Sequence, residues 1–150
     1  MTQSSATMNI RNGTPDDAPA VAALLGELGY PTTPEDAALR VRRINALEDA
    51  RLFVAADDGG SLLGLVSAQV LNGVMHANEP VGQITAMIVD SRARRGGVGR
   101  ALIAAIEGWL RARGCTKVNV TSKISRLDAH AFYEGLGYDR GGLRFTHVFE

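Results

Sequence analysis

The chain has 150 residues and a mass of 15.9 kDa, which is the size of a single compact domain. Sixteen basic and 16 acidic residues give a formal net charge of zero, so the chain lacks the overall basic field of a nucleic-acid-binding protein. Hydrophobic residues make up 45% and charged residues 21% of the chain, and these proportions exclude a largely disordered protein or a coiled coil.

The composition also argues against a metal centre and a membrane protein. The single cysteine, Cys115, cannot form an intramolecular disulfide, and the histidines complete no zinc-binding spacing, so we predict no bound metal. No apolar run approaches the roughly 18 residues of a membrane helix, and residues 1–7 lack the features of a signal peptide. We therefore expect a cytoplasmic protein without a membrane partner, in which residues 1–7 form a flexible leader.

Two helices are expected after a short first strand at Met8–Arg11. The segment Thr14–Asp17 combines a capping residue, a proline at the first helical position and acids in the first turn. Apolar residues then recur at helical spacing before Gly29 ends the helix, and they are Val21, Leu24, Leu25 and Leu28. Thr33–Asp36 repeats the start signal for a second helix, whose apolar residues are Val41, Ile44 and Leu47.

Strands follow the two helices. Leu52–Ala56 and Leu62–Val70 are predicted to form a hairpin because the Asp-Gly turn Asp57–Gly60 joins them. A polar loop, Asn72–Pro80, leads to a third strand at Gln83–Val89.

A glycine- and arginine-rich segment, Ser91–Arg100, follows that strand and is called the glycine loop below. Asp90 is expected to end the strand and support the loop. A helix with apolar spacing continues from Val98 to Leu110 and ends before Gly114. The remaining expected elements are a strand at Lys117–Val120, a helix at Asp128–Glu134 and a last strand at Phe145–Val148.

The glycine loop has the properties of an anion site. A loop that opens a helix directs backbone amides at one point, and Gly96, Gly97 and Gly99 let an anion approach closely. The spacing fits neither a P-loop nor Gly-x-Gly-x-x-Gly, which argues against mononucleotide hydrolysis and hydride transfer. The alternative is a flexible turn with a solvated basic run, and for Arg92 alone a solvated surface arginine is the preferred interpretation.

Arg94-Arg95-Gly96-Gly97-Val98-Gly99 resembles the acyl-CoA pyrophosphate loop, Arg/Gln-x-x-Gly-x-Gly/Ala, of the GCN5-related N-acetyltransferase (GNAT) superfamily. Ala129–Tyr138 is similar to the Ala-x-x-Phe-Tyr-x-x-x-Gly-Phe/Tyr segment of that superfamily. The resemblance implies one α+β domain over residues 8–150, an α/β sandwich with a mixed, mostly antiparallel sheet of about six to seven strands and about four helices. It also implies acetyl-CoA as co-substrate, with its pantetheine arm paired to the backbone of Met87–Val89. The strand that ends at Val89 and the strand that starts near Lys117 are expected to form a parallel pair that splays apart to admit pantetheine.

The resemblance further assigns residues that bind the coenzyme on the third strand, in the glycine loop and around the last helix. They are Met87, Ile88, Val89, Arg94, Arg95, Gly96, Gly97, Val98, Gly99, Arg100, Arg126, Ala129, Phe132 and Tyr133. Many relatives have asparagine where this chain has Arg126, which either reaches a phosphate of the ADP moiety or lies on the surface.

Acyl transfer from a thioester needs a neutral amine, donors for the developing oxyanion and preferably an acid for the departing thiolate. By resemblance Tyr133 is the general acid, with a packed core tyrosine as the alternative, and the Val89 amide serves the oxyanion. The base is unassigned, because Gln83 and Thr85 occupy the positions where some relatives have glutamate or histidine. A water relay or a loop base is left, with Glu27, His76, Glu79 and His147 as candidates.

The acceptor is expected to contact Tyr30, Gln83 and Thr85. It is a primary amine of a small molecule, of aminoglycoside, polyamine or amino-acid type, or a protein N-terminus or lysine. The alternative is a catalytically silent acyl-CoA-binding regulatory module, which the uncharged residues at the base positions would suit. The resemblance implies a homodimer, and no nucleic-acid partner is expected.

Overall fold

The computed structural model describes residues 8–74, 78–94, 96–120, 127–141 and 145–149. The chain divides into two compact units, Met1–Asn119 and Val120–Glu150. Within the described ranges, every helix is too short or too polar to cross a lipid bilayer.

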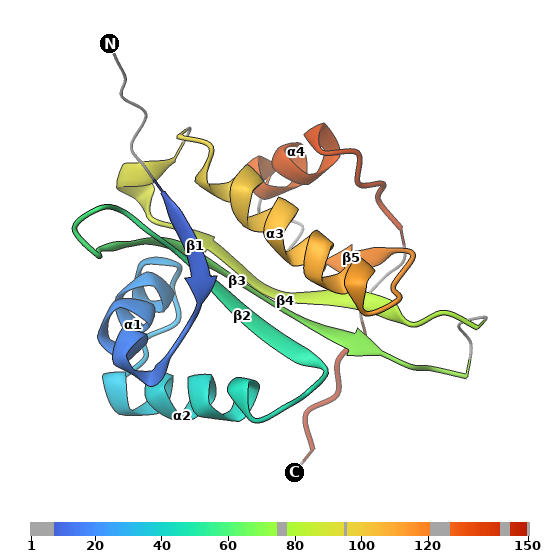
Figure 1. Cartoon of the computed structure of the whole chain (residues 1–150), viewed down its shortest axis with the longest axis horizontal. Helices are drawn as coiled ribbons and strands as arrows, with labels where there is room; N and C mark the ends of the chain where they lie inside the picture. Colours follow the sequence, from blue (N-terminus) through green and yellow to red (C-terminus); the bar gives the residue numbers. More distant parts are fainter. Residues whose placement is uncertain (1–7, 75–77, 95, 121–126, 142–144, 150) are drawn as a thin grey trace. The chain divides into compact units, whose positions relative to one another are not determined.

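In the described residues, five strands form one sheet in the order β1-β2-β3-β4-β5 (Figure 1). Their bounds are β1 Asn9–Asn12, β2 Ala50–Ala56, β3 Leu62–Leu71, β4 Val81–Val89 and β5 Val118–Val120. The pairs β1–β2, β2–β3 and β3–β4 are antiparallel. The Gly82 amide donates to the Lys117 carbonyl at 2.9 Å, which joins the beginnings of β4 and β5. The predicted α+β class and the mixed, mostly antiparallel sheet are confirmed.

Helices α1 (Ala18–Glu27) and α2 (Pro34–Asn45) cover one face of the sheet, and α3 (Val98–Ala112) covers the other (Figure 1). The core under α1 and α2 includes Val21, Val41, Val54 and Ile88. On the opposite face, α3 buries the apolar stripe Leu102, Ile106 and Leu110. The two layers around one sheet bury the amphipathic face of each helix.

Helix α3 packs closely because β3 and β4 offer glycines beneath it. A Cβ atom at Gly82 would lie 2.6 Å from Leu110 Cδ1, and one at Gly64 would lie 3.1 Å from Leu102 Cδ1. A Cβ at Gly64 would also lie 2.6 Å from the Ile88 carbonyl oxygen of β4. A larger residue at either position would therefore force the leucines of α3 to shift, and at Gly64 it would disturb the neighbouring strand as well. The glycines therefore fix the distance between α3 and the two strands that precede the glycine loop.

The start signals read from the sequence form the expected caps. A 3₁₀ turn at Pro15–Asp17 precedes α1, and Thr14 and Asp17 form a capping box around it. Thr33 Oγ1 accepts the Asp36 amide at 3.1 Å and caps α2. Gly29 has a φ of 102°, a left-handed conformation that favours glycine after a helix.

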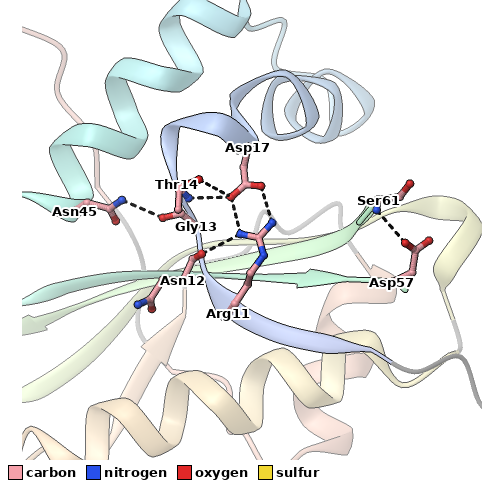
Figure 2. Close-up of polar contacts among 8 residues, drawn as sticks. All are labelled: Arg11, Asn12, Gly13, Thr14, Asp17, Asn45, Asp57 and Ser61. Carbon is pink, nitrogen blue, oxygen red and sulfur yellow. Dashed lines mark hydrogen bonds and ion pairs between the residues drawn. The ribbon is translucent and has the colours of Figure 1, made fainter. Parts of the chain in front are cut away.

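Figure 2 shows how the first strand is tied to this cap. The Arg11 guanidinium donates to both carboxylate oxygens of Asp17, at 2.9 and 2.8 Å, and the Thr14 amide donates to the same carboxylate at 2.8 Å. These bonds lower the pKa of Asp17, with the Arg11 side chain as the main cause. The carboxylate thus holds the end of β1 and the start of α1 together in its charged form.

Two predicted elements differ from the structure. Helix α2 ends at Asn45, and Leu47 lies beyond it with 56% of its surface exposed, because the Leu47 amide closes a tight turn onto the Ile44 carbonyl. Phe145–Val148 was predicted as a last strand, and this is wrong, since the segment is irregular. Its β-branched and aromatic residues favour a strand but do not supply the neighbouring backbone that a ladder requires. The five strands of the described residues accordingly fall short of six to seven.

The second unit contains the helix α4, Leu127–Gly135. Its aromatic rings pack on one another: Tyr133 lies 5.3 Å from Phe132 and 5.6 Å from Tyr138 between ring centroids. The amides of Leu136 and Tyr138 both donate to the Tyr133 carbonyl at 3.0 Å, and Gly137 adopts a φ of 91°. This arrangement confirms the helix expected at Asp128–Glu134 and its glycine stop.

Candidate functional site

Strand β4 carries one extra residue where it pairs with β3. Ser67 pairs with Ala86 and Ala68 pairs with Ile84, so Thr85 stands between them as a β-bulge. Gly82 faces Leu110 of α3, whereas Ala86 and Ile88 pack against the core under α1 and α2. Strict alternation would have placed Gly82, Ala86 and Ile88 on the same face of the sheet. The bulge therefore exchanges the two faces of β4 for the residues that follow Thr85.

Two of the residues predicted to contact the amine acceptor lie at or beside the bulge. Thr85 is exposed, and Gln83 is half-buried with its Nε2 3.3 Å from the Ile84 carbonyl. Neither side chain is an acid or a base at neutral pH, so their position on the strand suits hydrogen bonding to an acceptor. The third, Tyr30, is 44% exposed in the loop between α1 and α2, where its amide donates to the Leu25 carbonyl at 2.9 Å.

The predicted pantetheine-pairing residues Met87–Val89 form the last part of β4. On one edge they pair with β3, where Gly64 faces Val89 and Val66 faces Met87. On the other edge the neighbouring strand is β5. Splayed strands would leave this edge available to an extended ligand, and the splay remains a prediction.

The first part of the glycine loop is fixed by hydrogen bonds from successive amides. The Asp90 amide donates to the Leu63 carbonyl and the Ala93 amide to the Asp90 carbonyl, both at 2.8 Å. The Ser91 amide donates to Glu27 Oε1 at 2.8 Å, and the Arg92 amide donates to Asp90 Oδ1 at 2.9 Å. Consecutive amides from residue 90 to residue 93 are thereby satisfied before the glycines begin.

Asp90 organises this part of the loop, as the sequence predicted. Its buried carboxylate receives Arg92 Nη2 at 2.9 Å and Nε at 3.2 Å, in addition to the Arg92 amide. The Arg92 side chain and amide, together with the charge of Arg94, lower the pKa of Asp90, and the carboxylate raises the pKa of Arg92. Arg92 is thus paired with Asp90 while 87% of its side-chain surface stays exposed, in keeping with its interpretation as a solvated surface arginine.

The glycines lead into the N-terminus of α3. Gly97 is the N-cap residue with a φ of 82°, and the first helical hydrogen bond runs from the Ala101 amide to the Gly97 carbonyl at 3.0 Å. Among the described residues, no side chain caps this helix and no acid lies in its first turn. A long helix that begins in this way offers backbone amides and the positive end of its dipole to an anion.

The residues of the predicted phosphate site surround this helix end. Arg94 and Arg100 are exposed, Gly96 and Gly97 are exposed, Gly99 is half-buried, and Val98 is buried beneath the loop. A Cβ atom at Gly96 would lie 3.2 Å from the Ala93 carbonyl oxygen, so glycine also relieves crowding inside the loop. The loop residues that the resemblance assigned to the coenzyme therefore lie together at one end of α3.

The other candidates are scattered or lie elsewhere. Glu27 lies near the loop, Glu79 is exposed before β4, and His147 stacks edge-on with Phe149 in the second unit. Ala129 and Phe132 are half-buried on α4, and Tyr133 is buried there. His76, Arg95 and Arg126 lie outside the described residues.

Two features of the site escaped sequence analysis. The bulge at Thr85 leaves only a weak signal, because Ile84 and Ile88 fit an unbroken strand equally well. The contact between Glu27 and Ser91 joins residues 64 positions apart and has no local pattern. A signal for Asp90 did exist, since an aspartate directly after a strand commonly accepts the amide two residues on.

The model of the acetyltransferase (GNAT) family matches residues 20–138. Aminoglycoside N(6')-acetyltransferase type 1 of Stenotrophomonas maltophilia is 30% identical over 132 residues, which cover 87% of this chain and 85% of that protein. Aminoalkylphosphonate N-acetyltransferase of Salmonella typhimurium (strain LT2) is 29% identical over 137 residues, which cover 91% and 88%.

Solved structures share the fold as well. An aminoglycoside N-acetyltransferase in complex with CoA superposes with a TM-score of 0.85 and covers 99% of each chain. At 18% identity this likeness concerns the arrangement of the elements alone.

Proposed function

The chain belongs to the acetyltransferase (GNAT) family, and we propose that it transfers the acetyl group of acetyl-CoA directly to a primary amine of a small molecule. Membership makes it an acyltransferase with acetyl-CoA as co-substrate. The observation that carries the proposal is the glycine loop. Its first amides are hydrogen-bonded within the protein, and it leads into the N-terminus of a long helix that has no side-chain cap. Such a helix end suits the pyrophosphate of the coenzyme.

In this proposal the end of β4 holds the rest of the coenzyme. The pantetheine arm pairs with the backbone of Met87–Val89, and the Val89 amide donates to the thioester oxygen. The lone pair of the amine attacks the carbonyl carbon, the C–S bond breaks, and the thiolate leaves with the bonding electrons. Tyr133 donates a proton or a hydrogen bond to that thiolate, while the proton lost by nitrogen passes to water.

No strong base is required if the amine arrives neutral. A lysine-type amine has a pKa of about 10.4, so only a small fraction is neutral at pH 7. Gln83 and Thr85 cannot take its proton, and we propose a water relay on this part of β4. The rate is then expected to rise with pH in step with the neutral amine, by about tenfold per unit below the amine pKa.

The acceptor is proposed to be a small amine that reaches the exposed Thr85 and Tyr30. Relatives of this chain act on aminoglycosides and on aminoalkylphosphonates, so both classes belong in the first panel, beside polyamines, amino acids and a lysine peptide. The proposal includes a single domain over residues 8–150 and a cytoplasmic homodimer, for which light scattering after gel filtration gives the mass.

Thiol release from acetyl-CoA across this panel tests the function. At least one amine is expected to accelerate CoA release, with mass spectrometry finding the acetylated amine. Coenzyme binding without release for any amine would favour the silent regulatory module instead.

Tyr133→Phe is expected to lower kcat about tenfold with little change in KM for acetyl-CoA, because a thiolate with a pKa near 8.5 leaves readily without full protonation. The matched control is Tyr138→Phe, which removes a hydroxyl from the neighbouring ring. Equal kcat for the wild type and Tyr133→Phe would remove Tyr133 from the mechanism.

A further inference from the structure

Glu27 occupies a position where its charge is unfavourable for the helix that carries it. It is the last residue of α1, and a carboxylate there faces the negative end of the helix dipole. The last turn of α1 contains no basic residue that would offset this effect. The side chain is exposed, so the core does not require it either. A contact outside α1 accounts better for an acid at this position.

That contact is with the glycine loop. Glu27 Oε1 accepts the Ser91 amide at 2.8 Å, across 64 residues of sequence. Ser91 is the first residue after Asp90. The Asp90 amide donates to Leu63 of β3 and the Arg92 and Ala93 amides donate to Asp90, so Glu27 supplies the acceptor for the remaining amide of this run. The charge of Glu27 also contributes to the raised pKa of Arg92, behind Asp90. Glu27 and Asp90 are therefore two carboxylates that hold consecutive loop amides.

We propose that Glu27 is a positioning residue for the coenzyme loop, which it ties to the end of α1, and that it is not the general base. The inference rests on the proposed function, because it assigns the glycine loop to the coenzyme. One carboxylate oxygen is engaged as an acceptor by Ser91, at the opposite end of the loop from the amides of α3. Tyr30, which is expected to contact the amine acceptor, follows Glu27 by three positions. The contact between Glu27 and Ser91 therefore connects the proposed acceptor-binding loop after α1 to the glycine loop.

The cost of losing the contact is modest, because it is exposed and water can replace one partner. Glu27→Ala is expected to weaken coenzyme binding about three- to tenfold, by letting the loop relax before the ligand orders it. Glu27→Gln keeps an oxygen that can accept the Ser91 amide, and it is expected to bind within about twofold of the wild type. Glu35→Gln, at an exposed acid in the first turn of α2, is the matched control.

Calorimetric titration of each full-length variant with CoA measures these affinities, and hydrogen exchange of the peptide that contains Ser91–Ala93 reports the tether directly. The expected result is faster exchange and weaker binding in Glu27→Ala, with both restored in Glu27→Gln. Once an acceptor is known, KM for acetyl-CoA should rise in Glu27→Ala while kcat changes little. A general base would instead lose kcat equally in both variants.

The outcomes separate this inference from the function on which it rests. If the wild type binds CoA, and Glu27→Ala has the same CoA affinity and the same hydrogen-exchange rate at Ser91–Ala93, the positioning role is overturned. The acetyltransferase proposal would then stay intact. Equal loss of kcat in Glu27→Ala and Glu27→Gln overturns it in favour of a base. Failure of the folded wild type to bind CoA overturns both proposals together.

Discussion

Gly97→Glu is expected to lower the affinity for acetyl-CoA at least about a hundredfold, or about 2.7 kcal/mol. Gly97 is the N-cap of α3, at the point where the proposed pyrophosphate meets the helix amides. A glutamate there adds bulk in the path of the ligand and a negative charge beside a polyphosphate, and like charges in such contact cost several kcal/mol. The variant should still fold, because open space surrounds a Cβ at this position and an acid suits the start of a helix.

Backbone strain has to be separated from this effect. The φ of 82° at Gly97 costs other residues about 1 to 2 kcal/mol, so Gly97→Ala measures the strain without the bulk or the charge. Gly108→Glu is the matched control: Gly108 lies within the same helix, is exposed and has open space around its Cβ. Calorimetric titration is expected to find acetyl-CoA binding near the wild-type value in Gly108→Glu and within a few-fold of it in Gly97→Ala.

Equal affinity in Gly97→Glu and Gly108→Glu would place the coenzyme elsewhere. Titration with dephospho-CoA gives a second readout, since the exposed arginines Arg94 and Arg100 should make the missing phosphate matter. A loss of unfolding free energy in Gly97→Glu much above that in Gly97→Ala would show that the side chain disturbs the loop itself.

Local sequence predicted the parts of this fold that local interactions determine. The caps at Thr14 and Thr33 and the stop at Gly29 depend on backbone amides and dihedral angles a few residues away, and all three form as expected. The Asp57 turn behaves in the same way, with its carboxylate accepting the Gly59 and Ser61 amides at 3.0 and 2.9 Å. Each pattern carries its own physical cause in the neighbouring residues.

Features that depend on distant partners were missed or predicted wrongly. The bulge at Thr85 lets β4 pack against α3 before this residue and against the core under α1 and α2 after it. The sequence of the strand alone does not show this change of face. Phe145–Val148 has the β-branched and aromatic residues of a strand but forms no ladder in the described residues. The Ser91 amide finds its acceptor on α1, so the sequence identified Glu27 only as a candidate base and not as a partner of the loop. The candidate site was therefore predictable where it is a contiguous loop and unpredictable where tertiary contacts shape it.

Asp17→Ala is expected to destabilise the protein by about 2 to 3 kcal/mol at pH 7, far more than Asp16→Ala. The two acids are neighbours in the same 3₁₀ turn, but Asp16 is exposed, whereas Asp17 is buried. Removal of the Asp17 carboxylate deprives Arg11 of a bidentate partner and leaves the Thr14 amide without its acceptor. Arg11 keeps 37% of its side-chain surface exposed, so water limits the loss at that end of the pair.

The sign of the pH dependence follows from the lowered pKa of Asp17 in the folded state. A depressed carboxylate pKa stabilises the fold at any pH above the unfolded value of about 3.9, and this contribution is lost as the pH falls through the folded pKa. Urea unfolding at pH 7 and again below pH 3.5 should therefore show the gap between wild type and Asp17→Asn narrowing in acid. A gap that stays constant between those two pH values would mean that the charge on Asp17 does not stabilise the junction of β1 and α1, and that the loss comes from packing alone.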